Sequence, residues 1–373
     1  MPNSQTQTNK YEMYLLICVL ILIGIGIIMV YSSSAVLAGK KFGDDYYFLK
    51  RQIASMAFGI IALTLFRSIP CNLYKKLVYP ILLAGIGLLV LLLVPGVASE
   101  AGGAKRWLKL AGISFQPSEF VKIGLIIYLA YSMSKKQEKI KKFSIGFVPH
   151  AIVLVLIVVL LLMQPDFGTA CIITMIAWVM LFVGGVRLTH LFTAAMAVVP
   201  IGYYVFMNAG YRLRRVIAFM RPWENESDAG YQIVHSFMAF GSGGVLGKGL
   251  GNSLQKLFYL PEPHTDFIFS VIGEELGLVG VCLILLLFST ILWIGFRLAM
   301  KSHGAFESYM ATGITASLGI SVIINIAVVM GLFPTKGLTL PFISYGGSSL
   351  VLSLSSVGIL MSIARGSGKT KQS

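Results

Sequence analysis

Runs of about 20 apolar residues recur along nearly the whole chain, and this repetition restricts the fold more than any other feature. The runs fall near 14–34, 52–69, 77–96, 117–134, 146–163, 168–186, 188–207, 267–296, 308–331 and 342–364. Each is long enough to cross a bilayer as a helix, whereas a membrane β-barrel would show shorter segments of alternating polarity. We therefore predict an all-α polytopic membrane protein, a single domain over 1–373 with about ten transmembrane helices.

The composition supports a membrane protein and argues against other classes. Of the 373 residues, 56% are hydrophobic and 12% are charged, and the charged share is about half that of an average soluble domain. The net charge is +15, but no nucleic-acid-binding motif accompanies it, so we expect no nucleic-acid partner. Neither the cysteines nor the histidines show metal-ligand spacing, so we expect no dedicated metal site.

Basic residues in the loops predict the orientation. The densest cluster is Lys135, Lys136, Lys139, Lys141 and Lys142. Short loops rich in Lys and Arg stay in the cytoplasm, and placing this loop there puts both termini there, with tails at 1–13 and 365–373. It also places one long loop, 208–265, outside the membrane between the seventh and eighth spans.

The outer face is unexpectedly basic under this orientation. Its cations include Lys105, Arg106, Lys109, Arg212, Arg214, Arg215, Arg221, Lys248, Lys256 and Lys336. Two interpretations stay open from charge alone. The cations could contact anionic lipid headgroups, or they could form a site for a phosphate-bearing substrate.

One carboxylate, Asp266, lies where the long polar loop meets the eighth apolar run. An acid at the start of a helix is favoured by the helix dipole, which is the simple interpretation. The alternative is a carboxylate that does chemistry at the membrane surface. On a helix that begins there, Ser270, Gly273 and Gly277 share one face, which either packs against a neighbouring helix or leaves a groove.

Charged residues also lie inside predicted spans. Glu274 and Glu275 are two turns beyond the start of the eighth run, and carboxylates at that depth are costly unless paired, so we expect buried pairs. Glu119 and Lys122 are three residues apart on the fourth run and share a helix face. They either form a self-contained ion pair or point into a polar cavity that holds substrate.

Two loop segments have features of a binding site. Gly102 and Gly103 precede Lys105, Arg106 and Trp107, which suggests either an interfacial anchor or a lid over a pyrophosphate. Further on, 334–349 combines prolines with paired glycines at the start of the last span. This pattern predicts a broken helix, and irregular backbone at that depth must be buried in protein or line a cavity.

Several stretches, taken together and in order, resemble the SEDS family of shape, elongation, division and sporulation proteins over essentially the whole chain. They are GAKRW at 103–107, FQPSE at 115–119, QPDFGT at 164–169, HTDFIFSVIGEELG at 264–277 and PFISYGGSS at 341–349. Further stretches at 221–232, 249–267 and 334–342 look more like the division branch than the elongation branch.

The resemblance implies a ten-span fold and a peptidoglycan glycosyltransferase that polymerises lipid II into a nascent glycan strand. It implies a class B penicillin-binding protein and other division-complex proteins as partners. It further implies a multi-pass protein of the bacterial inner (plasma) membrane at the division septum. Asp266 matches the family's essential external aspartate, which makes it the expected general base.

The expected substrate-binding residues follow from the basic outer face, the polar spans and the broken last helix. They are Lys105, Arg106, Trp107, Glu119, Lys122, Arg212, Arg214, Arg215, Lys336, Ser344, Gly346 and Gly347. A divalent cation, Mg²⁺ or Mn²⁺, is left open as one that arrives with the substrate pyrophosphate. The competing functions are a lipid II flippase, an elongation-type polymerase and a non-catalytic scaffold.

Overall fold

The computed structural model describes residues 4–101, 104–110, 113–207, 210–226, 230–257, 260–335 and 337–369. The long helices are α1 (Ser4–Phe42), α2 (Tyr47–Ser68), α3 (Cys71–Leu91), α4 (Pro117–Lys135), α5 (Val148–Met163), α6 (Phe167–Val183), α7 (Leu188–Met207), α10 (Ile268–Lys301), α11 (Ala305–Val329) and α12 (Gly347–Lys369). Every predicted apolar run coincides with one of them to within several residues. The prediction of an all-α polytopic membrane protein is confirmed.

Within the described ranges, 7 helices are long and apolar enough to cross a membrane: α1, α2, α3, the helix that ends at Met163, α10, α11 and α12. Two apolar helices are shorter, Phe167–Val183 and the Leu188–Pro200 part of α7. Helix α4 carries Glu119 and Lys122 near its start. The exact number of spans stays a prediction.

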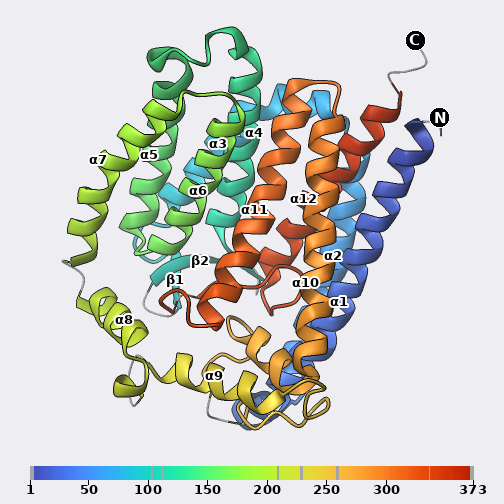
Figure 1. Cartoon of the computed structure of the whole chain (residues 1–373), viewed down its shortest axis with the longest axis vertical. Helices are drawn as coiled ribbons and strands as arrows, with labels where there is room; N and C mark the ends of the chain where they lie inside the picture. The colour runs from blue at the N-terminus through green and yellow to red at the C-terminus, as the bar shows by residue number, and fades with distance from the viewer. Residues whose placement is uncertain are drawn as a thin grey trace.

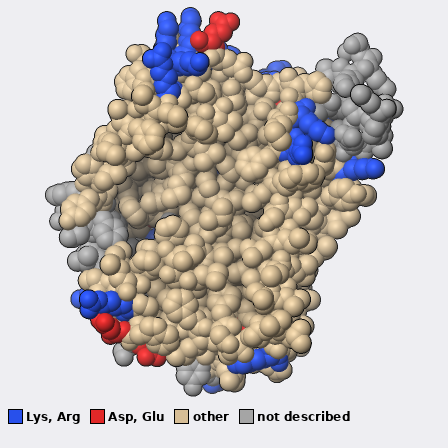
Figure 2. All heavy atoms as spheres, viewed as in Figure 1, with Lys and Arg blue, Asp and Glu red and all other residues tan. Residues whose placement is uncertain are grey.

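The long helices lie side by side, and both chain ends lie at one end of the bundle (Figure 1). Helices α8 (Gly210–Met220) and α9 (Tyr231–Gly243) lie at the opposite end. In the face shown in Figure 2, Lys and Arg gather toward the two ends and leave a wide band without charged atoms between them. This distribution fits a bundle whose middle is in contact with lipid.

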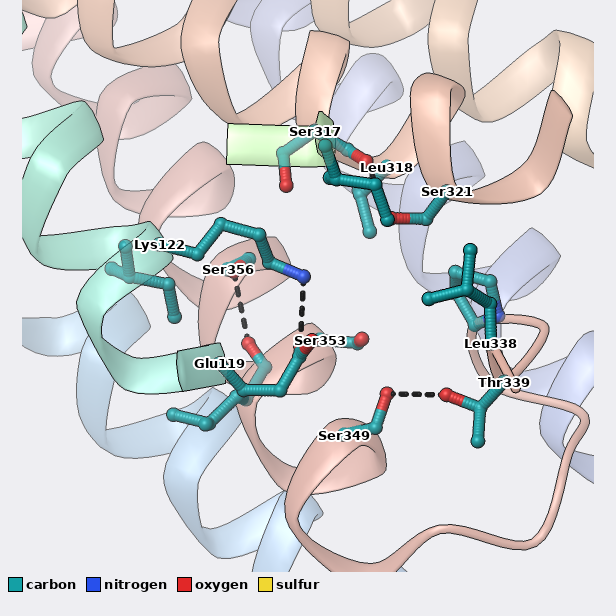
Figure 3. A pocket seen from close by; sticks show the side chains of 14 residues that line it. Glu119, Lys122, Ser317, Leu318, Ser321, Leu338, Thr339, Ser349, Ser353 and Ser356 are labelled. Carbon is teal, nitrogen blue, oxygen red and sulfur yellow. Dashed lines mark hydrogen bonds and ion pairs between the residues drawn. The ribbon is translucent and has the colours of Figure 1, made fainter. Parts of the chain in front are cut away.

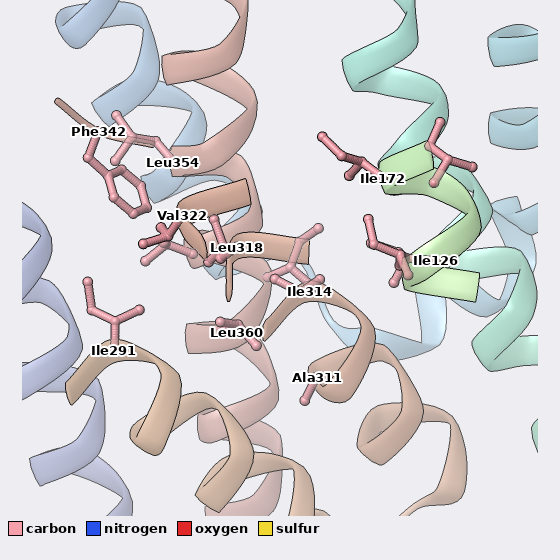
Figure 4. Close-up of a cluster of buried hydrophobic side chains, with 14 of the residues drawn as sticks. Ile126, Ile172, Ile291, Ala311, Ile314, Leu318, Val322, Phe342, Leu354 and Leu360 are labelled. Atoms are coloured by element: carbon pink, nitrogen blue, oxygen red, sulfur yellow. The ribbon is translucent and has the colours of Figure 1, made fainter. Parts of the chain in front are cut away.

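Helix α11 lies at the centre of the bundle. Its apolar side chains Ile314, Leu318 and Val322 are buried and meet side chains of neighbouring helices (Figure 4). Those neighbours include Ile126 on α4 and Leu360 on α12. Helix α11 packs against α4, α6, α10 and α12, and it therefore joins helices that are far apart in the chain.

The region 98–115 forms a structure that the sequence did not predict. Strands β1 (Ala98–Ala101), β2 (Ala104–Leu110) and β3 (Ile113–Phe115) pair in order as an antiparallel sheet. Strands this short show too little alternation of polar and apolar residues to be recognised in a sequence. The pair Gly102 and Gly103 indicated a loop instead. The sheet presents Arg106 and Trp107 from a paired strand rather than from a loose lid.

The described parts of the long loop 208–265 include helices. They are α8, the short helix Trp223–Asn225 and α9. The face of small residues on α10 packs against α9: the hydroxyls of Ser236 and Ser270 lie 2.8 Å apart, and a side chain at Gly273 would collide with Phe240. Helix packing is therefore the correct interpretation of that face.

Helix α10 is interrupted at Gly277, where φ is 63°. A segment of the long loop fills the break, because Lys248 N–H donates to the Glu274 carbonyl and Leu278 N–H donates to the Gly244 carbonyl, each at 3.0 Å. The predicted buried pairs are confirmed here: Lys248 Nζ lies 2.8 Å from Glu274, and Lys256 Nζ lies 2.7 Å from Glu275.

The predicted break before the last helix is confirmed as well. Helix α12 starts at Gly347, and residues 337–346 before it are not helical. Phe342 adopts a φ of 67°, which is uncommon for a bulky residue. Helix α1 supports this segment closely, since a side chain at Gly26 would lie 2.8 Å from the Phe342 carbonyl oxygen.

Candidate active site

Asp266 lies directly before α10, at the end of the bundle opposite the termini, and its side chain is half-buried. The non-helical segment 337–346 runs beside it. A Cβ placed on Gly337 would lie 2.9 Å from Asp266 Oδ2. A glycine at 337 therefore leaves room for the carboxylate.

The main chain that carries Asp266 is fixed at successive carbonyl groups. The His264 carbonyl accepts a hydrogen bond from Tyr345 N–H at 2.9 Å. The Thr265 carbonyl accepts one from the Ser344 hydroxyl at 2.6 Å, and the Asp266 carbonyl accepts one from Asn325 Nδ2 at 3.0 Å. The carboxylate therefore projects from a backbone that is held in place.

The surroundings change the acidity of the carboxyl group. Burial raises the pKa of Asp266 to about 7, and the negative charge of Glu262 acts in the same direction. The guanidinium groups of Arg106 and Arg215 act against this rise and lower the pKa, as does a hydrogen bond with Thr265. A carboxylate with a pKa near the working pH is suited to take up a proton during a reaction.

His264 next to this acid stays neutral. Burial lowers the pKa of His264 to about 4, and Lys41 acts in the same direction. Its ring lies 4.3 Å from the ring of Phe48 and 5.6 Å from that of Tyr345, measured between centroids. The ring therefore packs the Asp266 loop against α2 and the non-helical segment.

Two of the predicted arginines act on Asp266 from different elements. Arg106, on β2, donates to the Pro165 carbonyl at 2.9 Å and lies 3.6 Å from Asp166. Arg215, on α8, donates to the Thr335 carbonyl at 3.1 Å. Asp166 caps α6 by accepting from Thr169 N–H, and it also lies beside Arg106.

Glu119 and Lys122 form the ion pair that their spacing predicts, with Lys122 Nζ 2.7 Å from Glu119 Oε2. They also line a pocket, and whether that pocket holds substrate stays a prediction. The cavity volume of the pocket is about 30 Å³, and Leu338 and Thr339 lie on its wall. Its other polar lining consists of hydroxyl groups of α11 and α12: Ser317, Ser321, Ser349, Ser353 and Ser356 (Figure 3).

Ser344, Gly346 and Gly347 have packing roles in this structure. Ser344 is 3% exposed, and besides donating to Thr265 its hydroxyl accepts from Leu340 N–H at 2.8 Å. A Cβ on Gly346 would lie 3.2 Å from Thr339, and one on Gly347 would lie 3.1 Å from the hydroxyl of Ser55. These residues shape the segment beside Asp266.

The structure describes the other predicted substrate-binding residues only in part. Trp107 is half-buried on β2, and Arg214 is exposed on α8. Lys105 pairs with Glu100 through the backbone of β2, and Arg212 lies on α8, but their side chains are outside the described part of the structure. Lys336 lies outside the described residues.

No cluster of three or more metal-ligating side chains is found in the described ranges. A cation that comes with a pyrophosphate needs fewer protein ligands than a resident ion does. The Mg²⁺ or Mn²⁺ left open above therefore stays a prediction about the substrate.

Reasoning from the sequence missed Asn325 and the packing role of His264. Asn325 is the one amide side chain among the apolar and hydroxyl residues of the run 308–331, and such a residue gives no pattern in one sequence. His264 is the first residue of the resembling motif at 264–277, but its contacts with Phe48 and Tyr345 join segments far apart in the chain. Both are recognised only when the helices are placed together.

Comparisons with known proteins agree with this architecture. The model of a family described as "Cell cycle protein", with members of the FtsW, RodA and SpoVE types, matches residues 12–369. The "Probable peptidoglycan glycosyltransferase FtsW" of Geobacter sulfurreducens is 47% identical over 360 residues, covering 96% of both chains. "Stage V sporulation protein E" of Bacillus subtilis is 41% identical, covering 96% of this chain and 98% of its own.

Solved structures show the same fold. A chain of a peptidoglycan synthase complex that coordinates polymerization and crosslinking superposes with a TM-score of 0.80 and 28% identity, covering 95% of this chain and 98% of that one. The rod shape determining protein RodA of Thermus thermophilus superposes with a TM-score of 0.69 and 28% identity, covering 94% and 95%. From the family match and the full-length relatives together, this multi-pass membrane chain belongs to the FtsW/RodA/SpoVE family, that is, to the SEDS proteins.

Proposed function

We propose that this chain is a peptidoglycan glycosyltransferase that polymerises lipid II at the outer surface of the bacterial inner membrane, with Asp266 as its general base. One observation carries the proposal. Asp266 has a pKa raised to about 7, and two arginines of separate elements act on it at the end of the bundle opposite the termini. The full-length FtsW relatives supply the reaction class.

The reaction joins two polyprenyl-pyrophosphate-linked sugars. The 4-hydroxyl oxygen of the acceptor N-acetylglucosamine forms a bond to C1 of the donor N-acetylmuramic acid, and the bond from C1 to the pyrophosphate oxygen breaks. The hydroxyl proton passes to the Asp266 carboxylate as the new bond forms. General base catalysis of this kind contributes about 10²- to 10⁴-fold to the rate.

The leaving polyprenyl pyrophosphate gains negative charge, which nearby cations stabilise. Arg106 and Arg215 are the best placed of the described cations, because both already act on Asp266. A fixed donor of this type contributes about 3 kcal/mol in comparable anion-stabilising sites. A bound Mg²⁺ or Mn²⁺ would supply additional charge to the pyrophosphate, and its ligands would come from the substrate.

The pocket beside the active segment is polar and small, with room for a group of about the size of a water molecule. Its hydroxyl side chains and the Glu119–Lys122 pair offer donors and acceptors for sugar or phosphate oxygens. Thr339 on its wall is two residues from Gly337, which lies against the Asp266 carboxylate. A substrate group in the pocket would therefore lie close to the proposed base.

A cellular role follows from the division-type relatives. We propose that the protein acts at the division septum with both termini in the cytoplasm. A class B penicillin-binding protein would supply the crosslinking activity, within the division complex. The match to a chain of a synthase complex that coordinates polymerization and crosslinking supports this partner.

A lipid II flippase is the second candidate, since a polar pocket among membrane helices also suits a transporter. Vesicles that contain the purified protein, its penicillin-binding partner and fluorescent lipid II separate the two functions. We expect glycan polymer on the outer face, without movement of lipid II between leaflets. Translocation without polymer would overturn the proposal.

A further inference from the structure

We infer that Asn325 is a positioning residue, which fixes both the main chain of Asp266 and the segment that lies against its carboxylate. This inference rests on the proposed function, because it concerns the base of that reaction. Asn325 lies on α11, the central helix, and is 2% exposed. It does not need to touch substrate for this role.

Two hydrogen bonds from one amide group carry the inference. Asn325 Nδ2 donates to the Asp266 carbonyl at 3.0 Å and to the Leu338 carbonyl at 2.5 Å. Leu338 follows Gly337, where an added Cβ would lie 2.9 Å from Asp266 Oδ2. One side chain on a central helix therefore sets the distance between the base and the wall that faces it.

The chemistry of the amide determines its orientation. Both acceptors are carbonyl oxygens, so only the NH₂ end of Asn325 can face them. The carbonyl end of the Asn325 amide is energetically unfavourable, because Oδ1 is buried and has no hydrogen-bond partner among the described residues. A buried acceptor without a partner costs stability, and its presence beside the proposed base indicates selection for placement rather than for stability.

Other contacts hold only the preceding residues. Ser344 and Tyr345 bind the Thr265 and His264 carbonyls, and both belong to the segment before α12. Asn325 holds Asp266 itself, from a different helix. Misplacement of a catalytic group by about 1 Å can cost about 100-fold in rate, so the contact at Asp266 should affect turnover most.

The test uses the full chain with its penicillin-binding partner and purified lipid II. Asn325→Ala removes both donors, and Asn325→Asp keeps the shape but in its ionised form has no donor and adds a charge. We expect kcat to fall on the order of 10- to 100-fold in both variants. KM for lipid II should stay within about twofold of wild type, because the substrate contacts are unchanged.

The pH profile supplies a second readout beside the separate changes in kcat and KM. The charged groups that act on Asp266 in the described structure are Glu262, Arg106 and Arg215. Asn325→Asp adds a negative charge to this set, so the midpoint of the profile should move to higher pH. Asn325→Ala adds no charge, so its midpoint should stay at the wild-type value.

Thr312→Val is the matched control. Thr312 is buried on the same helix, but its hydroxyl donates to the Ser308 carbonyl of its own helix. We expect wild-type kcat from this variant. If Asn325→Asp fails to fold, as judged by its melting curve, Asn325→Ala carries the kinetic test.

Wild-type kcat in a folded Asn325→Ala, or a rise in KM alone, would overturn the inference while leaving the proposed function intact. Asp266→Asn is assayed alongside to separate the two claims. If Asp266→Asn polymerises normally, the base assignment itself fails, and the positioning role fails with it. An inactive Asp266→Asn with fully active Asn325 variants defeats the positioning role alone.

Discussion

The buried ion pair between Lys256 and Glu275 gives the sharpest stability prediction. Lys256 Nζ lies 2.7 Å from Glu275 Oε1, and the two side chains are 5% and 0% exposed. The Ser32 hydroxyl on α1 donates to Glu275 at 2.8 Å and accepts from Lys256 Nζ at 3.0 Å. The pair therefore ties the long loop to α10 and α1 in a place that water does not reach.

Lys256→Met keeps much of the side-chain volume but leaves Glu275 buried with only Ser32 among the side chains described as its partners. Breaking a buried pair by removing one partner costs about 3–5 kcal/mol. Lys248→Met is the matched control. Lys248 is 31% exposed, and its partner Glu274 keeps hydrogen bonds from Ser253, Leu254 N–H and Gln255 N–H, so we expect a loss of about 1 kcal/mol.

Thermal unfolding of the purified protein in one detergent measures the difference. A chain of this size loses about 2 °C of melting temperature per kcal/mol. Lys256→Met should therefore melt about 6–10 °C below wild type, and Lys248→Met about 2 °C below it. The double variant Lys256→Met/Glu275→Leu should recover most of the loss, because no unpaired charge is left in the interior. Equal melting temperatures for the two single variants, or a double variant no better than Lys256→Met, would refute this reasoning.

Further predictions concern catalysis. The pKa of Asp266 is about 7, and a base acts in its ionised form, so kcat/KM should rise about tenfold per pH unit below pH 7 and level off above it; a flat profile from pH 5.5 to 8.5 contradicts this. His264 has a pKa of about 4, so His264 should add no second transition in that range. Arg106→Ala should lower kcat on the order of 100-fold and should also lower the melting temperature, because it removes the ion-pair partner of the buried Asp166; wild-type turnover would remove Arg106 from the site. Gly337→Ala crowds the Asp266 carboxylate and should lower kcat on the order of tenfold, whereas Gly87→Ala, where the added methyl meets nothing within 4 Å, should leave kinetics unchanged.

The helices could be predicted from the sequence because each apolar run is long enough to cross a bilayer as a helix. It could also be predicted that Glu274 and Glu275 each have a partner of opposite charge, since an unpaired carboxylate at that depth is too costly to persist. Neither inference needs knowledge of distant neighbours. The break before α12 could be predicted in the same way, because prolines and paired glycines in the segment itself indicate it.

The sheet over 98–115 could not be predicted, because its strands are too short to show a clear alternation. Asn325 could not be found either. Its partners, Asp266 and Leu338, come from two other segments of the chain, and their meeting depends on how α11 packs in the bundle. The Asp266 assignment came from a resemblance, and the structure adds the raised pKa and the two arginines.

The most direct test of the central claim is glycan-strand formation by Asp266→Asn, purified with its penicillin-binding partner and supplied with lipid II. The amide keeps the shape of the carboxylate but cannot take up the proton. We expect the variant to fold and to bind lipid II as the wild type does, while forming no polymer above background. Polymer formed at the wild-type rate would show that another group activates the acceptor hydroxyl.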